Sequence, residues 1–202
     1  MLGVVLVGID VASRLLAEQW LSKQVRAATG ATSVSATLND VPFLPPLLFS
    51  GSIAHVKVVA FGVPAGRFTI ERVSVEATGT RLDRKLLFAD QTVKPTAISS
   101  ARITVEVSGA ELSKALGYPI SLKQDGQATV VVRGQRLPAS ARIVAGHLLV
   151  VDVAGTAVAT VDLSRSPLVP SCPMTMAISH ATLSLGCRIT PVPTSLLRAL
   201  SD

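Results

Sequence analysis

The chain has 202 residues, of which 49% are hydrophobic and only 3% aromatic, and its formal net charge at pH 7 is +6. That length fits one domain of ordinary size with a substantial core. The mean hydropathy of +0.51 is high for a water-soluble protein, yet no internal run of about 18 apolar residues predicts a membrane span. The aromatic residues are not interleaved with the cations, which disfavours single-strand nucleic-acid binding. The basic surface suits anionic lipid headgroups, or serves solubility alone.

The N-terminal segment MLGVVLVGID is apolar for nine residues and stops at Asp10. It is too short to span a bilayer and lacks the basic region that begins a signal peptide. It fits either a first core strand or the remnant of a signal or anchor segment. The amphipathic segment directly after it favours the second interpretation. Residues 1–9 are therefore predicted to be that remnant, and residues 10–202 a single domain.

Residues 10–28 lack Pro and Gly and predict a helix, with Asp10 as its N-cap and Gly30 as its stop. Leu15 and other apolar residues share one side of this helix, whereas Leu16 and Trp20 lie on the opposite side. A helix that is apolar on two sides is usually contacted on two sides. A sheet that curls around the helix would provide both contacts.

The segment VPFLPPLLFSG, residues 41–51, combines two adjacent prolines with the densest cluster of large apolar side chains in the chain. The prolines argue against both a helix and a central strand. Loops normally run over the surface and are polar. An apolar segment without regular structure is therefore a candidate for a special role.

From residue 55 the apolar period changes to two, as in half-buried antiparallel strands. Ser108 and Glu111 form a capping-box pattern before a short helix at residues 109–116, closed by Gly117, and a short terminal helix is expected from Pro193. In HLLVVDVAG both faces are apolar, which predicts a strand covered on each side. With no βαβ alternation, the seven or eight strands predict an α+β protein with an antiparallel sheet. The predicted strand segments are HVKVVAFGV, RFTIERVSVEATG, SARITVEVSG, ATVVVRG, ARIVAGHLLVVDVAG, AVATVDLS and TMAISHATLSLGCRIT.

The chain has two cysteines, Cys172 and Cys187. They do not form a CxxC motif and have no histidines at zinc-like spacing, so no metal site is predicted. If joined, they close a loop of roughly 15 residues; the alternative is two buried free thiols. The export-like N-terminus favours the disulfide and an oxidising compartment outside the cytoplasm.

No catalytic signature is present: the chain lacks a G-x-S-x-G elbow, a Walker loop, G-x-G-x-x-G and H-E-x-x-H. His55, His147 and His180 are scattered over predicted strands, where a lone histidine is usually a surface residue or a satisfied core residue. Acidic residues are sparse, and no two carboxylates can be placed together. The chain is therefore predicted not to be an enzyme, and no cofactor is expected.

Three features in order along the chain resemble the LmeA-like lipid-binding envelope proteins of actinobacteria. The apolar N-terminus runs into a helix that opens with Asp10. The apolar segment at residues 41–51 follows, and then a strand with the pattern of residues 56–63. The resemblance is sharpest from residue 10 to about residue 75. This chain departs from the family pattern in having Asp40 and Val41 before the Pro-Phe pair, and adjacent prolines where polar residues are common.

The resemblance implies a cell-envelope protein that binds phospholipid and supports the assembly of mannose-bearing lipoglycans such as lipomannan. It also implies a tubular lipid-binding fold, in which a curved antiparallel sheet wraps around a long N-terminal helix and leaves an apolar groove. The two-sided helix agrees with that fold, and equally with a closed sandwich. A single asparagine and an excess of Arg over Lys agree with a GC-rich actinobacterial origin.

Three interpretations of residues 41–51 stay open. The side chains plug one end of the core, or they line the mouth of an apolar groove and contact acyl chains or a bilayer, or they form a protein–protein patch. In a groove, acyl-chain burial contributes about 0.8 kcal/mol per CH₂. The residues predicted to contact lipid are Phe43, Leu44, Leu47, Leu48 and Phe49. The residues predicted to bind the headgroup are Arg81, Arg84 and Lys85, for which a solvated turn is the other explanation.

The sequence therefore predicts a non-enzymatic phospholipid-binding or lipid-transfer protein of the cell envelope, exported or anchored through its N-terminus. Its predicted partners are a phospholipid or another acyl-chain lipid and the membrane surface, and not nucleic acid. The main alternative is an envelope scaffold protein that binds another protein through the same apolar segment. A third, less favoured, is a glycan-processing enzyme whose site carries no motif.

Overall fold

The computed structural model describes residues 2–89, 94–123, 127–145, 148–153, 155–162, 172–179, 181–194 and 197. Within these ranges, one long and three short helices accompany eleven strands. In chain order the elements are α1 (Leu2–Thr29), β1 (Ser33–Leu38), α2 (Leu44–Ser50), β2 (Ser52–Ala65), β3 (Phe68–Leu82), α3 (Arg84–Ala89), β4 (Pro95–Ser108), α4 (Gly109–Leu116), β5 (Ile120–Leu122), β6 (Ala128–Val132), β7 (Gln135–Val144), β8 (Leu148–Val153), β9 (Thr156–Asp162), β10 (Met174–Ser179) and β11 (Thr182–Ile189).

The strands form two sheets, one of six strands in the order β1-β2-β3-β4-β11-β10 and one of five in the order β5-β6-β7-β8-β9. The predicted class is confirmed: the protein is α+β, with an N-terminal helix and two antiparallel sheets that do not close into a barrel. The chain forms two compact units, unit 1 of Met1–Ala60, Ser74–Arg102 and Ile189–Asp202, and unit 2 of Phe61–Val73 and Ile103–Arg188.

In unit 1, α1 begins at Leu2, and residues 2–9 form its first turns. The prediction of Asp10 as the N-cap is therefore wrong, and so is the alternative that the N-terminal residues form a strand. The stop is confirmed, because Gly30 has a positive φ of 66° and its N–H donates to the Arg26 carbonyl. None of the helices in the described ranges has both the length and the apolarity needed to cross a bilayer.

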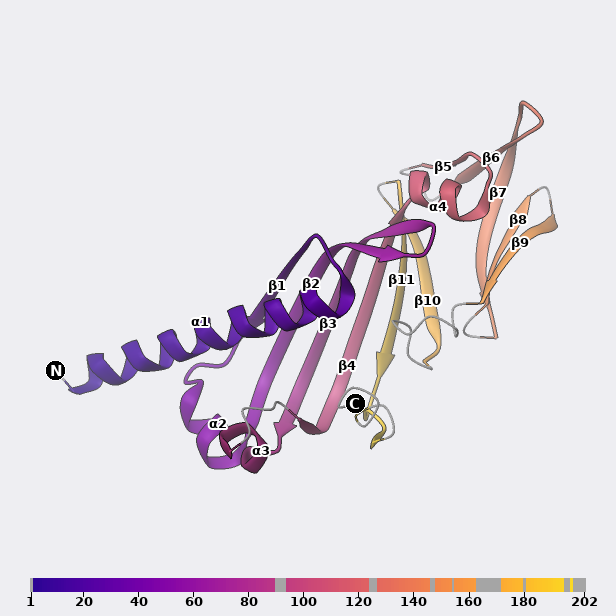
Figure 1. Cartoon of the computed structure of the whole chain (residues 1–202). Helices are drawn as coiled ribbons and strands as arrows, with labels where there is room; N and C mark the ends of the chain where they lie inside the picture. Colours follow the sequence, from indigo (N-terminus) through magenta and orange to yellow (C-terminus); the bar gives the residue numbers. More distant parts are fainter. Residues whose placement is uncertain are drawn as a thin grey trace. The chain divides into compact units, whose positions relative to one another are not determined.

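One face of α1 contacts β1 through polar side chains. The Glu18 carboxylate accepts the Leu38 N–H at 2.8 Å, and the Ser22 hydroxyl accepts the Ala36 N–H at 2.9 Å. Because β1 is the first strand of its sheet, these N–H groups would otherwise form an open edge. Figure 1 shows α1 lying across β1, with α2 and α3 next to each other near one end of β2 and β3.

The apolar side chains of α1 remain largely outside the core of unit 1. Leu16 and Trp20, predicted to face a covering sheet, are 67% and 42% exposed, and Leu15 on the other arc is 48% exposed. The helix therefore packs on unit 1 through residues spaced by four, which include Glu18 and Ser22. No described residue covers the second face that was predicted to be in contact, and Leu16 and Trp20 on it are exposed.

The segment at residues 41–51 contains α2, which corrects the prediction of an irregular segment. The first four N–H groups of a helix lack intrahelical partners. Here the Phe43 and Leu44 N–H groups donate to the Asp10 carboxylate of α1 at 2.6 to 3.0 Å, and the next two residues, Pro45 and Pro46, have no N–H to satisfy. The two prolines are therefore compatible with the first turn of this helix.

The core of unit 1 beside α2 consists of four buried side chains, with Ala17, Leu44, Leu47 and Val56 packed against it. The four are Leu38, Phe43, Ile53 and Leu82. They come from β1, the start of α2, and strands β2 and β3, so that α2 is fixed to the sheet through its first turn.

In unit 2, β10 and β11 pair as a hairpin, and β10 contacts β7 of the five-stranded sheet. The core includes Leu122, Ala128 and Leu183. The strand predicted to be covered on both faces is confirmed, because Val150 and Val151, neighbours on opposite faces of β8, are both buried.

Helix α4 confirms the predicted N-cap. The Ser108 side chain accepts the Glu111 N–H, and the helix ends at Gly117 with φ of 75°. The Glu111 carboxylate accepts the Thr69 N–H at 2.7 Å and pairs with Lys114. It is therefore directed to a neighbouring strand, although a full capping box would have turned it back to Ser108.

Two predicted strand segments are hairpins in the structure. Residues 141–155 contain the end of β7 and all of β8, and residues 175–190 contain most of β10 and all of β11. The short strands β1 and β5 were not predicted, since six and three residues carry too little periodicity. The predicted terminal helix from Pro193 lies mostly outside the described residues.

The predicted disulfide is confirmed: Cys172 and Cys187 are joined, and both are buried. Met174 lies opposite Cys187 in the register of β10 and β11, so the bond ties the chain that enters β10 to the end of β11.

Replacing both Cys172 and Cys187 by Ala is expected to lower the free energy of unfolding by about 3 kcal/mol, because the loop is no longer closed in the unfolded chain. Urea denaturation followed by circular dichroism measures the change. Reducing the wild-type protein should produce the same loss and leave the variant unaffected. A variant as stable as the oxidised wild type would show that the bond contributes nothing.

The variant Asp10→Asn is expected to destabilise the protein most at neutral pH and progressively less in acid. The N–H groups of Leu44 and Phe43 hold the Asp10 pKa below its ordinary value of 3.8. The stabilisation is therefore present above the pKa of the unfolded chain and disappears as pH falls through the lower pKa of the folded protein. Urea denaturation between pH 7 and pH 2 gives the difference between the two proteins. A difference that does not change with pH would contradict the assignment.

Candidate functional site

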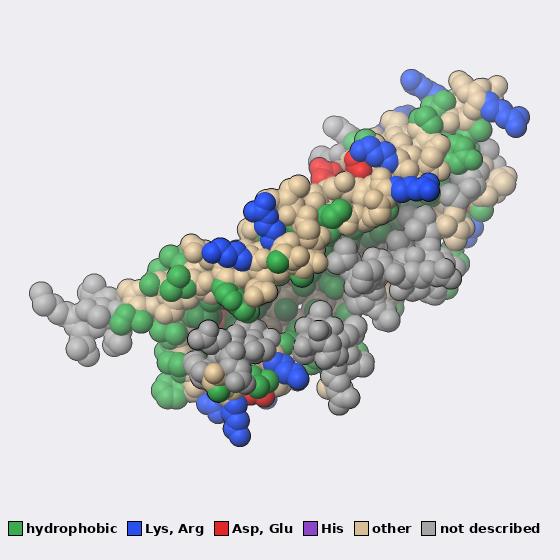
Figure 2. All heavy atoms as spheres, viewed as in Figure 1, with side chains coloured by type: hydrophobic (Ala, Val, Ile, Leu, Met, Phe, Trp, Pro, Cys, Tyr) green, Lys and Arg blue, Asp and Glu red, His purple; other side chains and the backbone are tan. Residues whose placement is uncertain are grey.

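An apolar cleft of about 380 Å³ lies in unit 1 between α1 and the segment that contains α2. Its volume is within the range of about 300 to 1,000 Å³ that is typical of small-molecule sites. Figure 2 shows hydrophobic side chains along α1 and on α2. The lining residues are Ile9, Asp10, Val11 and Arg14 from α1, and Val41, Pro42, Leu44, Pro45, Leu48 and Phe49 from the facing segment.

The two walls of the cleft carry apolar side chains that the fold leaves exposed. On the α1 wall, Ile9 is 51% and Val11 43% exposed, and on the facing wall Leu48 is 47% and Phe49 82% exposed. Exposed apolar side chains that gather on facing walls are typical of a binding site, whereas single ones are common on any surface. The arrangement can take up an apolar chain without further chemistry.

The cleft contains two charged residues, and the fold uses one of them. Asp10 is engaged by the N–H groups of α2, as described above. Arg14, one turn further along α1, has its Nε atom 3.8 Å from the Glu18 carboxylate and without a hydrogen bond. Its guanidinium is therefore a cation at an apolar cleft, with the carboxylates of Glu18 and Asp10 as electrostatic partners.

The C-terminal end of α2 is held as firmly as its start. The Arg84 guanidinium donates to the Leu48 and Phe49 carbonyls at 3.2 and 2.7 Å, and the Gly51 N–H donates to Leu47. Gly51 has φ of 65°, and a Cβ there would lie 2.8 Å from the Leu82 carbonyl oxygen, so only glycine fits. The wall formed by α2 is thus fixed at both ends.

The five residues predicted to contact lipid divide into two groups. Phe43 is 2% exposed and belongs to the core, and Leu47 packs against that core without lining the cleft. Leu44, Leu48 and Phe49 line the cleft. The same segment therefore packs into the core through Phe43 and forms one wall of the cleft through Leu44, Leu48 and Phe49, and its contact with lipid stays a prediction.

The three cations predicted to bind the headgroup have different surroundings. Arg84 caps α2, Lys85 is exposed in the first turn of α3, and Arg81 lines a separate cavity. Sequence reasoning missed Arg14 and the α1 wall. The sequence feature that could have indicated them is the spacing of four between Asp10, Arg14 and Glu18, which places all three on one face of the helix.

The separate cavity beside residues 39–42 is more polar and has a volume of about 520 Å³. Asp40 is buried, and its carboxylate accepts the Ala54 and His55 N–H groups at 2.6 and 3.2 Å. It fixes the start of β2, which gives a structural role to one residue at which the chain departs from the family pattern. His147 and His180 lie outside the described residues.

Among the described residues, no three His, Cys, Asp or Glu side chains lie close enough to hold a metal ion. No curated protein and no solved structure gave a match to the chain. The sequence model of the LmeA-like phospholipid-binding proteins matches residues 9–198, nearly the whole chain, and the match includes both walls of the apolar cleft. The chain therefore belongs to the LmeA-like phospholipid-binding family.

Proposed function

We propose that the apolar cleft of unit 1 receives an acyl chain of a phospholipid, and that the protein binds or transfers lipid without catalysis. The observation that carries this proposal is the pair of exposed apolar walls, one on α1 and one on α2, with α2 fixed by hydrogen bonds at both of its ends. Each CH₂ group buried there contributes about 0.8 kcal/mol. Leu44, Leu48 and Phe49 are the predicted lipid contacts that this proposal keeps, with Ile9 and Val11 added.

We assign the phosphate of the lipid to Arg14. Arg14 lines the cleft, and its Nε atom makes no hydrogen bond. Guanidinium groups form charge-assisted, often bidentate hydrogen bonds with phosphate oxygens. A phospholipid bound in this way places its acyl chain against the apolar walls and its phosphate next to the Arg14 guanidinium. Arg81, Arg84 and Lys85 stay predictions for headgroup binding, since none of them lines this cleft.

A membrane surface is the source from which such a protein would take its lipid. Leu16 and Trp20 form an exposed apolar ridge on α1, and exposed Lys23 and Arg26 follow on the same helix. An aromatic and aliphatic ridge next to cations is suited to the boundary between acyl chains and anionic headgroups. We therefore propose that α1 contacts the bilayer during lipid uptake.

The compartment we propose is the cell envelope, outside the cytoplasm. The disulfide between Cys172 and Cys187 supports an oxidising environment. Within the envelope, the role we propose is support of lipoglycan assembly, which rests on the resemblance to the LmeA-like proteins of actinobacteria. The protein would supply or hold a lipid for that assembly.

The second candidate is a scaffold that binds an envelope protein through the same apolar residues. Val41 and Phe49 favour it, because they are 84% and 82% exposed and would be covered by a partner. Native mass spectrometry of the protein purified from a membrane-containing lysate separates the two candidates: a bound phospholipid supports the first, and a stoichiometric protein partner without lipid supports the second.

Changing Val11 and Leu48 to Ser in one variant is expected to weaken binding of monomeric dihexanoyl-phosphatidylglycerol by about tenfold or more, because both walls lose apolar contact with the acyl chains. Isothermal titration below the micelle concentration measures this without a membrane. The matched control changes Leu15 and Leu16 to Ser, which are as exposed but do not line the cleft. Equal losses in both variants would contradict binding in the cleft.

Arg14→Gln is expected to weaken binding of the same phospholipid by about tenfold and to leave binding of uncharged dihexanoylglycerol unchanged, because only the phosphate makes the charge-assisted hydrogen bond. Titration of both ligands against both proteins measures the difference. If the two ligands lose affinity equally, Arg14 shapes the cleft and does not bind phosphate.

A further inference from the structure

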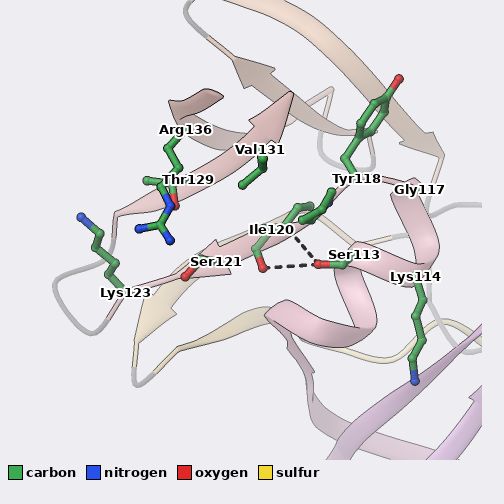
Figure 3. Close-up of a pocket in the computed structure, with 11 residues that line it drawn as sticks. Ser113, Lys114, Gly117, Tyr118, Ile120, Ser121, Lys123, Thr129, Val131 and Arg136 are labelled. Carbon is green, nitrogen blue, oxygen red and sulfur yellow. Dashed lines mark hydrogen bonds between the residues drawn. The ribbon is translucent and has the colours of Figure 1, made fainter. Parts of the chain in front are cut away.

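A further open cavity, of about 610 Å³, lies in unit 2 where the end of α4 meets the five-stranded sheet (Figure 3). It is separate from the acyl-chain cleft and shares no residue with it. A ligand could bind here whether or not the cleft of unit 1 binds lipid. Its walls are formed by the end of α4 with the turn that follows it, and by strands β5, β6 and β7.

The cavity lies on the outward face of the sheet. Val130 of β6 is 2% exposed and faces the core, so its neighbours Thr129 and Val131 face outward. Ser121 lies directly opposite Thr129, and Arg136 directly opposite Val131. The pairing thus brings two hydroxyl groups and a guanidinium from three strands to one surface.

The described residues give this surface a positive charge. Lys123, Arg136 and Lys114 line the cavity, and no carboxylate from the described part of the chain lines it. Lys114 is paired with Glu111, whereas the side chains of Lys123 and Arg136 form no ion pair with any described residue. In the view of Figure 3, Lys123 and Arg136 lie on the same side of the cavity and Lys114 points away. Two cations therefore remain available to a ligand.

The opposite side of the cavity is apolar and well fixed. Tyr118 is 44% exposed there, beside Pro119 and Ile120. The Ser113 hydroxyl of α4 accepts the Ile120 N–H at 2.7 Å, which ties the turn that carries Tyr118 to the start of β5. An aromatic ring with a polar tip, held on a fixed turn, provides contact area for the organic part of a ligand.

We propose that this cavity binds a phosphate ester of a small hydroxyl-bearing molecule. Lys123 and Arg136 contact the phosphate, Ser121 and Thr129 donate or accept further hydrogen bonds, and Tyr118 packs against the organic group. Arginine binds phosphate bidentately and lysine as a point charge. The volume exceeds the lower limit of about 300 Å³ for small-molecule sites, so the organic group has room. The ester is either a soluble molecule or the exposed headgroup of a lipid.

The test is titration of glycerol 3-phosphate into the intact protein, followed by the amide signals of unit 2 in NMR spectra. Saturable shifts at residues 113–136 are expected. Changing Lys123 and Arg136 together to Gln should weaken binding by about tenfold or more, as the loss of charge-assisted contacts requires. The absence of saturable shifts, or unchanged binding by this variant, overturns the proposal.

The matched control removes two charges elsewhere in unit 2. Arg67 and Arg188 are exposed and do not line the cavity, so changing both to Gln should leave binding unchanged. If this variant loses as much affinity as the cavity variant, binding follows net charge and the site is refuted. The cleft variant with Ser at positions 11 and 48 should still bind glycerol 3-phosphate, which separates failure of this site from failure of the proposed lipid cleft.

Two further measurements identify which part of the ligand Tyr118 contacts and where the ester comes from. Tyr118→Ala should weaken glycerol 3-phosphate binding and leave binding of inorganic phosphate unchanged; equal effects on both would contradict contact with the organic group. Phosphatidylglycerol vesicles distinguish the source of the ester. If vesicle binding requires Lys123 and Arg136 and is displaced by glycerol 3-phosphate, the site binds a lipid headgroup. If vesicle binding does not depend on these two residues, the ligand of the site is a soluble ester.

Discussion

Two backbone N–H groups at the start of α2, those of Phe43 and Leu44, donate to the carboxylate of Asp10 on α1. A helix start normally leaves four N–H groups to be satisfied. The two prolines that follow remove the other two, so one carboxylate accepts both N–H groups that remain at the helix start. The contact also fixes the distance between α1 and α2, and the cleft between them depends on it.

The polar packing of α1 explains where the apolar surface of unit 1 lies. Glu18 and Ser22 satisfy the edge strand β1 on the same helical face as Asp10. Because that face carries polar contacts, side chains such as Val11 and Leu16 are left outside the core. If α1 packed on the sheet through its apolar side, those side chains would be buried in the core of unit 1 and no apolar cleft would remain beside the helix. Part of the apolar content behind the high mean hydropathy of the chain is thus exposed on α1 and at the cleft.

The fold class, the disulfide, the cap of α4 and the family could be predicted from the sequence, because each depends on local spacing or on a motif. The division within residues 41–49 could not. Phe43 and Leu48 are both large, apolar and close in sequence, yet one is buried and the other exposed, because Asp10, 33 residues before Phe43, orients the helix. Arg84 was equally ambiguous: its role as a cap for α2 depends on a contact with residues 35 and 36 positions away.

The central claim is that the acyl chain lies between α1 and α2. The most direct measurement is photo-crosslinking with a phospholipid that carries a diazirine on its acyl chain, followed by mass spectrometry of the labelled peptides. The account predicts that the label is concentrated on residues 9–14 and 41–49. Labels that fall mainly on unit 2, or that spread evenly over the chain, would contradict it.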